Sequence, residues 1–186
     1  MKKLLIFTCL LSACAFASAQ TQEGNLLVGG NISNFRLDFQ DESTTFQMTL
    51  TPKIAYFIRD NMALGGYGEL GIIAAKDNDA LVNYGIGALG RYYISDESTV
   101  VVRDSRFFLE ANAGFHGNNG PANTNGIGIG FGPGWTYFIT ENIGLEALLK
   151  YNLTVGLGNS TTNNNLNLGV GFQIYLPTRG LRERLE

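Results

Sequence analysis

One segment near the C-terminus alternates between apolar residues and mostly polar residues. Between Ile143 and Leu157 every odd-numbered residue is apolar, while the even-numbered residues are mostly polar or glycine and include Glu146 and Lys150. Because successive side chains of a strand point to opposite faces, this segment has one apolar face and one mostly polar face. Strands of soluble proteins usually run about 5–6 residues, whereas a tilted strand needs about 9–11 residues to cross a bilayer. The pattern is therefore typical of a barrel wall with lipid outside and a polar lumen inside.

The rest of the chain divides into similar extended segments. The eight expected strands cover residues 25–39, 45–58, 63–75, 80–94, 106–116, 126–139, 144–157 and 163–176. The alternating apolar residues change from even-numbered to odd-numbered positions between Ile32 and Phe35, which predicts a β-bulge there. Pro52 and Pro133 each remove a ladder hydrogen bond, so a bulge is expected at both. We predict an all-β fold, a single antiparallel eight-stranded up-and-down transmembrane β-barrel over residues 20–176.

The connectors between these segments alternate in length. Residues 59–61 and 140–142 form short turns, and the links around 40–44, 76–79, 117–125 and 158–162 are polar and longer. Bacterial barrels place short turns on the periplasmic side and longer loops outside. Both termini are therefore expected in the periplasm. The link at 95–105 departs from the pattern, since it should be a periplasmic turn yet is long.

The N-terminus predicts export. Two lysines, a short apolar stretch and a small-x-small pattern before Gln20 indicate a signal peptide over residues 1–19. A second interpretation stays open, because residues 11–14 fit a lipobox that would leave a lipidated Cys14 at the mature N-terminus. Cys9 and Cys14 both lie in this leader, so cleavage after Ala19 leaves no cysteine. That excludes disulfide scaffolds, thiol catalysis and cysteine-ligated metals.

Charge and hydropathy narrow the class of partner. The formal net charge is −3, and loss of Lys2 and Lys3 with the leader lowers it to −5. The chain has no basic stripe, so nucleic acid is excluded as a partner. A mean hydropathy of only +0.03 fits a barrel, whose apolar residues are spread by alternation rather than gathered in one run.

An internal sequence repeat indicates repeated hairpins. Residues 52–64 resemble residues 133–145, with a partial third copy at 92–97, and each copy places aromatic residues just before an expected periplasmic turn. Amphipathic rings favour the boundary between membrane and water. We therefore predict an aromatic girdle made of Tyr56, Phe57, Tyr92, Tyr93, Trp135, Tyr137, Phe138 and Tyr175.

With this architecture and turn motif, the chain resembles the small eight-stranded outer-membrane barrels of the OmpA/OmpX type, often described as porin-family or outer-membrane β-barrel domain proteins. The resemblance covers residues 20–176. It implies integral location in the bacterial outer membrane, contact with outer-membrane lipid, and insertion by the barrel-assembly machinery. Such barrels tend to end on an aromatic residue, whereas residues 177–186 follow Tyr175 here. We expect those residues to be a short periplasmic tail.

The odd or even position of a residue in its strand, which we call its parity, also predicts which charged side chains face the lumen. Three cations and three anions share the polar faces, namely Lys53, Glu69, Arg91, Glu110, Glu146 and Lys150. A charge in a narrow, partly dry interior needs a partner. The first interpretation is a salt-bridged plug, since an eight-stranded barrel is only just wide enough to be filled by its own side chains. The alternative is a gate whose pairs exchange partners to let ions pass.

No motif for catalysis, cofactor binding or metal binding is predicted. Some eight-stranded barrels are lipid-modifying hydrolases that use a histidine with a serine and an acid. The chain has one histidine, His116, and no serine lies on the outer half of its strand. The acids at 38–42 and 77–79 lack the spacing of a calcium loop. The glycines of residues 126–132 open no helix, so they are not a phosphate loop.

The sequence leads to a structural or adhesive hypothesis. We expect a monomeric outer-membrane scaffold, not an enzyme, with external loops that can contact a ligand. The rivals are a narrow or gated channel for ions or small solutes, an outer-membrane lipid-modifying enzyme, and a soluble lipocalin-like barrel. The last of these inverts the pattern, because a soluble barrel places its apolar residues inside.

Overall fold

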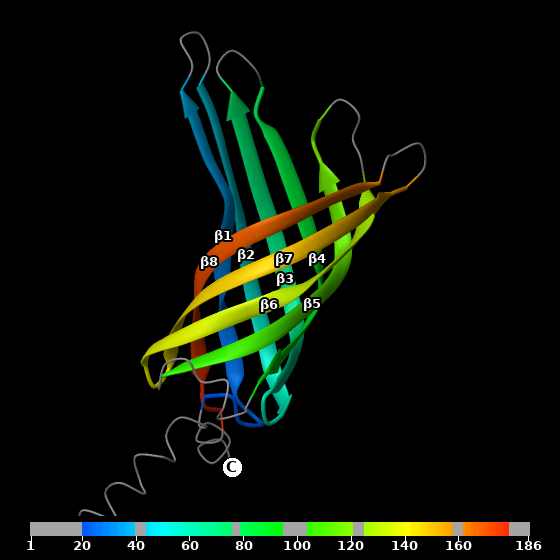
Figure 1. Cartoon of the computed structure of the whole chain (residues 1–186). Coiled ribbons are helices and arrows are strands. Elements are labelled where there is room, and N and C mark those ends of the chain that lie inside the picture. The colour runs from blue at the N-terminus through cyan, green and yellow to red at the C-terminus, as the bar shows by residue number, and fades with distance from the viewer. Residues whose placement is uncertain are drawn as a thin grey trace, which may run out of the picture.

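Eight antiparallel strands close into a barrel in which each strand pairs with its sequence neighbours and β8 returns to β1 (Figure 1). The structure is a computed structural model that describes residues 20–39, 44–75, 79–94, 104–120, 125–157 and 162–178. The strands are β1 (Leu26–Phe39), β2 (Thr44–Arg59), β3 (Met62–Ala75), β4 (Leu81–Tyr93), β5 (Ser105–Asn118), β6 (Gly126–Thr140), β7 (Ile143–Gly156) and β8 (Asn163–Leu176). In Figure 1, β6, β7 and β8 cross the front diagonally, while β1 to β4 run behind them.

The predicted fold class is confirmed, and the predicted strand limits are close to those observed. β8 covers the predicted residues, and β2 is one residue longer at each end than predicted. Both short turns form, with two residues each, 60–61 and 141–142, between their strands. Asn61 takes a φ of 64° in the first turn, a conformation that Asn tolerates better than most residues. The leader, most of the external links, residues 95–103 of the link at 95–105 and most of the tail lie outside the described residues.

The two faces of the wall are inverted relative to a soluble barrel. Leu149 and Leu168 face each other across β7 and β8 and are 41% and 64% exposed on the outer surface. Lys53, in contrast, is only 4% exposed and points into the lumen. Large apolar side chains outside and charges inside are the arrangement that lipid requires. Among the residues that the structure describes, no helix is long and apolar enough to cross a membrane.

The bulge predicted in β1 is confirmed. Pairing with β2 is regular up to Ser33 and resumes in a shifted register at Arg36. Asn34, between them, takes a left-handed φ of 53°. The shift restores Phe35 to the outer face, where it is 67% exposed. The change in apolar parity therefore has the physical cause expected of it, an extra residue in one strand.

The bulges predicted at the two prolines are wrong. Pairing of β2 with β3 skips Pro52 but keeps the same register on either side, and pairing of β6 with β7 does the same at Pro133. Both prolines lie exposed on the outer face. Each interrupts the ladder locally without inserting a residue. The register shifts lie instead just before the short turns, between Phe57 and Arg59 and between Phe138 and Thr140.

Candidate functional site

The centre of the lumen holds a network of buried ion pairs that joins both neighbouring strands and strands that are not neighbours in the sheet. Lys53 of β2 donates to both carboxylate oxygens of Glu110 of β5, at 2.7 and 2.8 Å. Arg91 of β4 reaches the same carboxylate through Nε at 3.1 Å and Nη2 at 2.6 Å. Glu110 therefore accepts from two cations.

Arg91 also joins the opposite wall. Its Nη1 and Nη2 donate to Glu146 of β7 at 2.5 and 3.0 Å. The remaining acceptor capacity of Glu146 is taken by Thr136 at 3.1 Å, Gln173 at 3.1 Å and the Tyr175 hydroxyl at 3.3 Å. A buried carboxylate with this many donors is fully compensated for its lost hydration. We call Lys53, Arg91, Glu110 and Glu146 the central network.

The central network carries two positive and two negative charges, and each of its residues is at most 4% exposed. Removing one partner from a buried ion pair leaves an uncompensated charge, which typically costs about 3–5 kcal/mol. The network also ties β2, β4, β5 and β7 together across the lumen. Its arrangement can therefore stiffen the barrel and obstruct its middle.

A layer of aromatic rings fills the lumen between the central network and the short-turn end. Phe57, Tyr93, Phe108, Phe138 and Tyr175 are all buried there. Their ring centroids lie 5.2–6.3 Å apart, which is the range of favourable aromatic pairs. The Tyr93 and Tyr175 hydroxyls are 2.7 Å apart, and Arg91 Nη1 donates to Tyr93 at 2.9 Å. We call these five residues the aromatic layer.

The aromatic layer corrects the predicted girdle. Phe57, Tyr93, Phe138 and Tyr175 were expected at the membrane boundary, and this is wrong, because they point inward. The reason is the alternation of a strand: only one of two consecutive aromatic residues can face lipid, and Tyr175 likewise stands at an inward position of β8. Phe57 and Tyr93 have the same parity as Lys53 and Arg91 on their own strands, so for these two residues the signal was present in the sequence.

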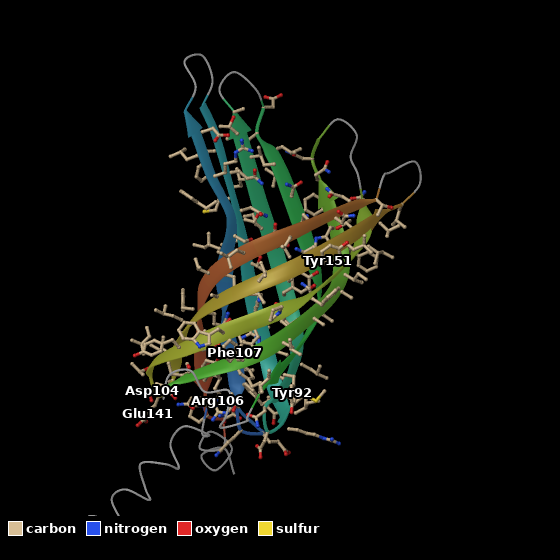
Figure 2. All side chains as sticks on the ribbon, viewed as in Figure 1. Tyr92, Asp104, Arg106, Phe107, Glu141 and Tyr151 are labelled. Atoms are coloured by element: carbon tan, nitrogen blue, oxygen red, sulfur yellow. The ribbon has the colours of Figure 1, made fainter. Side chains whose placement is uncertain are left out.

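The other four predicted girdle residues do lie on the outer face. Tyr56 and Tyr92 are exposed, and the rings of Trp135 and Tyr137 stack with centroids 6.1 Å apart. Figure 2 shows Tyr92 near the short-turn end and Tyr151 toward the opposite end of the wall. The placement of all four near the short turns fits the role of an interfacial anchor.

Two of the six predicted lumen charges are not part of the central network. Glu69 lies 3.6 Å from His116 Nδ1, and the Tyr67 hydroxyl lies 3.1 Å from His116 Nε2. Lys150 Nζ lies 5.8 Å from the centre of the Tyr67 ring. These residues form a second, more open level of the lumen, on the side away from the aromatic layer.

Several residues of the site escaped the sequence analysis. Thr136, Gln173 and Tyr67 have lumen parity, which was visible, but no sequence signal showed that the first two contact Glu146 or that Tyr67 contacts His116. In the described part of the chain, no three histidine or acidic side chains come together as a metal-binding group. Asp38, one of the acids considered for calcium, pairs with Arg36 at 2.6 Å.

Comparison with known proteins identifies the family. The model of the outer membrane protein β-barrel domain matches residues 5–173. The chain belongs to this family. It is therefore an integral protein of the bacterial outer membrane, and the wall with apolar residues outside is its lipid-facing surface. No curated protein sequence matches the chain.

Several solved structures are similar to this chain at low sequence identity. Neisserial surface protein A is 14% identical, with a TM-score of 0.51 over 82% of this chain and 95% of that one. The N-terminal barrel of Pseudomonas aeruginosa OprF is 18% identical, with a TM-score of 0.48 over 82% and 98%. Yersinia pestis Ail is 11% identical, with a TM-score of 0.48 over 83% and 100%. At such identities the likeness to Neisserial surface protein A concerns the fold alone.

Proposed function

We propose that this protein is a non-conducting outer-membrane scaffold, whose sealed barrel holds external loops for structural or adhesive contacts. The observation that supports the proposal most directly is the double obstruction of the lumen. The central network lies next to the aromatic layer, and Arg91 joins the two. It donates to Glu110 within the network and to Tyr93 in the aromatic layer. A gate would have to break two kinds of packing at once.

The charge balance of the seal argues against easy opening. An ion passing the central network would have to separate Arg91 from Glu146 or Lys53 from Glu110, and each pair is buried. These side chains are buried, and in a low-dielectric interior the attraction between opposite charges is strong. Beyond them the ion would meet the aromatic layer, which offers little compensation for lost hydration.

Conductance in planar lipid bilayers tests the seal. The wild-type protein is expected to show no steady single-channel steps. Arg91→Met, which breaks the central network, and Lys150→Met, which removes a lumen cation outside it, are the matched variants. Well-defined steps in the wild type that disappear in Arg91→Met and persist in Lys150→Met would establish the rival function, a gated channel.

The adhesive part of the proposal concerns the external links. Residues 117–125 and 158–162 are rich in Gly, Asn and Thr, which suits solvated loop tips. Replacing the parts of these links between the strands, residues 121–124 and 158–161, with Gly-Ser sequences of equal length is expected to leave the barrel folded and to reduce the attachment to surfaces of cells that display the protein. Equal attachment of cells with the wild-type protein and cells with the replaced loops would reject adhesion through these loops and leave a structural role.

We also propose that the protein is not a lipid-modifying enzyme. Within the described residues, His116 forms a hydrogen bond with the Tyr67 hydroxyl and lies 3.6 Å from Glu69, and no serine hydroxyl bonds to it. Purified protein is expected to release no fatty acid from phospholipid vesicles or from lipopolysaccharide. Fatty-acid release that is lost in His116→Ala would reverse this conclusion.

A further inference from the structure

The barrel wall is incomplete at one seam. β1 and β8 pair from Leu26 with Leu176 up to Ser33 with Gly169, and the ladder between them then ends. Both strands continue beyond this point, β1 to Phe39 and β8 from Asn163. There β1 pairs with β2 and β8 pairs with β7. In Figure 1 the upper part of β1 runs upward, while β8 turns away across the front.

The outer surface remains apolar on both sides of this seam. Phe35 and Leu37 of β1 are 67% and 45% exposed, and Leu166 and Leu168 of β8 are each 64% exposed. All four lie beyond the last pair of the ladder. The apolar surface that faces lipid therefore extends past the point at which the wall ends.

The length and tilt of β1 place the opening in the outer part of the membrane. Leu26 pairs with Tyr56, an outward tyrosine near the short-turn end. Ser33 is seven residues further along β1, about 18 Å along the axis for a strand tilted by about 40°. The apolar band of such barrels is about 25 Å tall. Unpaired strand edges do not face hydrocarbon in stable barrels, so this seam needs a polar occupant.

A polar cavity lies directly behind the opening. Residues from both sides of the seam line it, Asn31 and Ser33 from β1 and Asn167 and Gly169 from β8. Lys53, Glu69 and Lys150 also line it. Its volume is about 30 Å³, which suits about two or three water molecules, or one group of similar size such as a phosphate or carboxylate.

The lining contains an unused hydrogen-bond donor. Asn31 is 4% exposed, and its Nδ2 has no hydrogen-bond partner in the structure. Among the described residues, Lys150 forms no ion pair, whereas Lys53 is held by Glu110. Glu69 is the one acid of the lining, and His116 lies 3.6 Å from it. A buried donor without a partner is costly, so the cavity favours a group that accepts hydrogen bonds and carries negative charge.

We propose that the seam between β1 and β8 is a lateral binding site for an anionic membrane lipid. The phosphate or carboxylate of the head group enters the cavity and accepts hydrogen bonds from Asn31 Nδ2 and Lys150. The remainder of the head group occupies the seam beside the free strand edges. The acyl chain stays outside, along Phe35, Leu37, Leu166 and Leu168.

Glycine at position 169 keeps the entrance open. A Cβ added there would have the Ser33 Cβ at 3.5 Å as its nearest neighbour, which is an ordinary contact. A Cβ therefore fits there without disturbing the backbone, and the longer side chain of leucine would extend from it into the entrance. Gly169→Leu is thus a blocking variant, and Val170→Leu, on the outer face of the same strand, is its control.

Nuclear magnetic resonance on the barrel in dodecyl maltoside micelles tests the site. Lysophosphatidylglycerol is titrated in, and the side-chain amide signals of Asn31 and Asn167 are followed. We expect saturable shifts in the wild type and in Val170→Leu. Lys150→Met is expected to weaken binding about tenfold, as loss of a charge-assisted hydrogen bond does, and Gly169→Leu is expected to abolish the shifts.

Two further probes establish the route and the chemistry. Monoacylglycerol, which lacks the phosphate, is expected to produce no saturable shift at Asn31. Glycerol 3-phosphate, which lacks the chain, is expected to bind far more weakly than the lipid. Equal binding of glycerol 3-phosphate, or an unchanged response in Gly169→Leu, would show entry from the lumen and overturn the lateral site. The absence of any lipid-dependent shift in the wild type would also overturn it. If Gly169→Leu does not fold, Lys150→Met and the two probes decide.

Discussion

Arg91 and Glu146 meet across the lumen in a two-pronged ion pair, with Nη1 to Oε1 at 2.5 Å and Nη2 to Oε2 at 3.0 Å. They stand on β4 and β7, which are not neighbours in the sheet. Both side chains are 0% exposed. A planar guanidinium matches a carboxylate in this geometry better than any other cation can. The pair thus fixes the distance between two walls that the sheet itself connects only through intervening strands.

Arg91→Met should therefore be strongly destabilising. It removes the shared cation of Glu110 and Glu146, and leaves the second carboxylate buried without an ionic partner. We expect a loss of about 3–5 kcal/mol in the free energy of unfolding, measured by urea titration in lipid vesicles. Lys150→Met serves as the control and should have a much smaller effect. Equal losses in both variants would mean that the central network has no special role in stability.

The direction of each side chain in β7 can be tested with a charge. Leu149 is 41% exposed on the lipid-facing surface, so Leu149→Arg should cost about 2–4 kcal/mol near the middle of the bilayer. Thr154 faces inward, toward Gly126 and Gly128, near the outer end of the same strand, and Thr154→Arg should cost much less. Unfolding in vesicles compares the two. A larger loss for Thr154→Arg would contradict the assignment of the faces.

Gly134 is expected to tolerate no side chain. A Cβ added there would overlap the ring of Phe108, which lies 4.0 Å below the Arg91 guanidinium carbon. Gly134→Ala should therefore lower stability by about 1–3 kcal/mol, the usual cost of overpacking. Gly68→Ala is the matched control, because its nearest neighbour would be the Pro52 ring at an ordinary 3.6 Å. If both variants unfold at the same urea concentration, the aromatic layer is looser than its geometry indicates.

Trp135 offers a test of depth in the membrane. It is the one tryptophan of the sequence, and its ring stacks on Tyr137 close to a short turn. Its fluorescence should be quenched more by bromine attached to lipid chains near the head groups than by bromine near the chain ends, because aromatic belts lie at the interface. Stronger quenching from the chain ends would place the short turns too deep for an interfacial anchor.

The fold was predictable because the signal for a lipid-facing wall is long and regular. Alternation over residues 165–176 predicted most of β8, and the change of the apolar residues from even to odd positions near Ile32 predicted the bulge in β1. The prolines were misinterpreted, because a lost hydrogen bond does not require an extra residue. Nothing in the local pattern of Pro52 distinguishes an interrupted ladder from a bulge.

The sequence predicted which face of the wall the site residues occupy, but it did not predict which of them contact one another. Parity placed Lys53, Glu110 and Lys150 in the lumen, but it says nothing of their height or of their position around the barrel. Those depend on strand tilt and register, which relate residues far apart in the chain. Lys53 thus meets Glu110, fifty-seven residues away, while Lys150 stays at another level. The aromatic layer was mispredicted for a different reason. The positions of its residues in their strands indicated an inward direction, but the prediction was based on the preference of aromatic rings for the membrane boundary.

The aromatic layer gives the interior a direction. In the proposed sealed barrel, the outer mouth opens to the level of Tyr67 and Lys150, and the rings of the aromatic layer lie behind Arg91 at the other end. On this proposal, a molecule bound at that level enters and leaves by the same mouth. Binding by the loops or by the upper lumen is then separate from permeability.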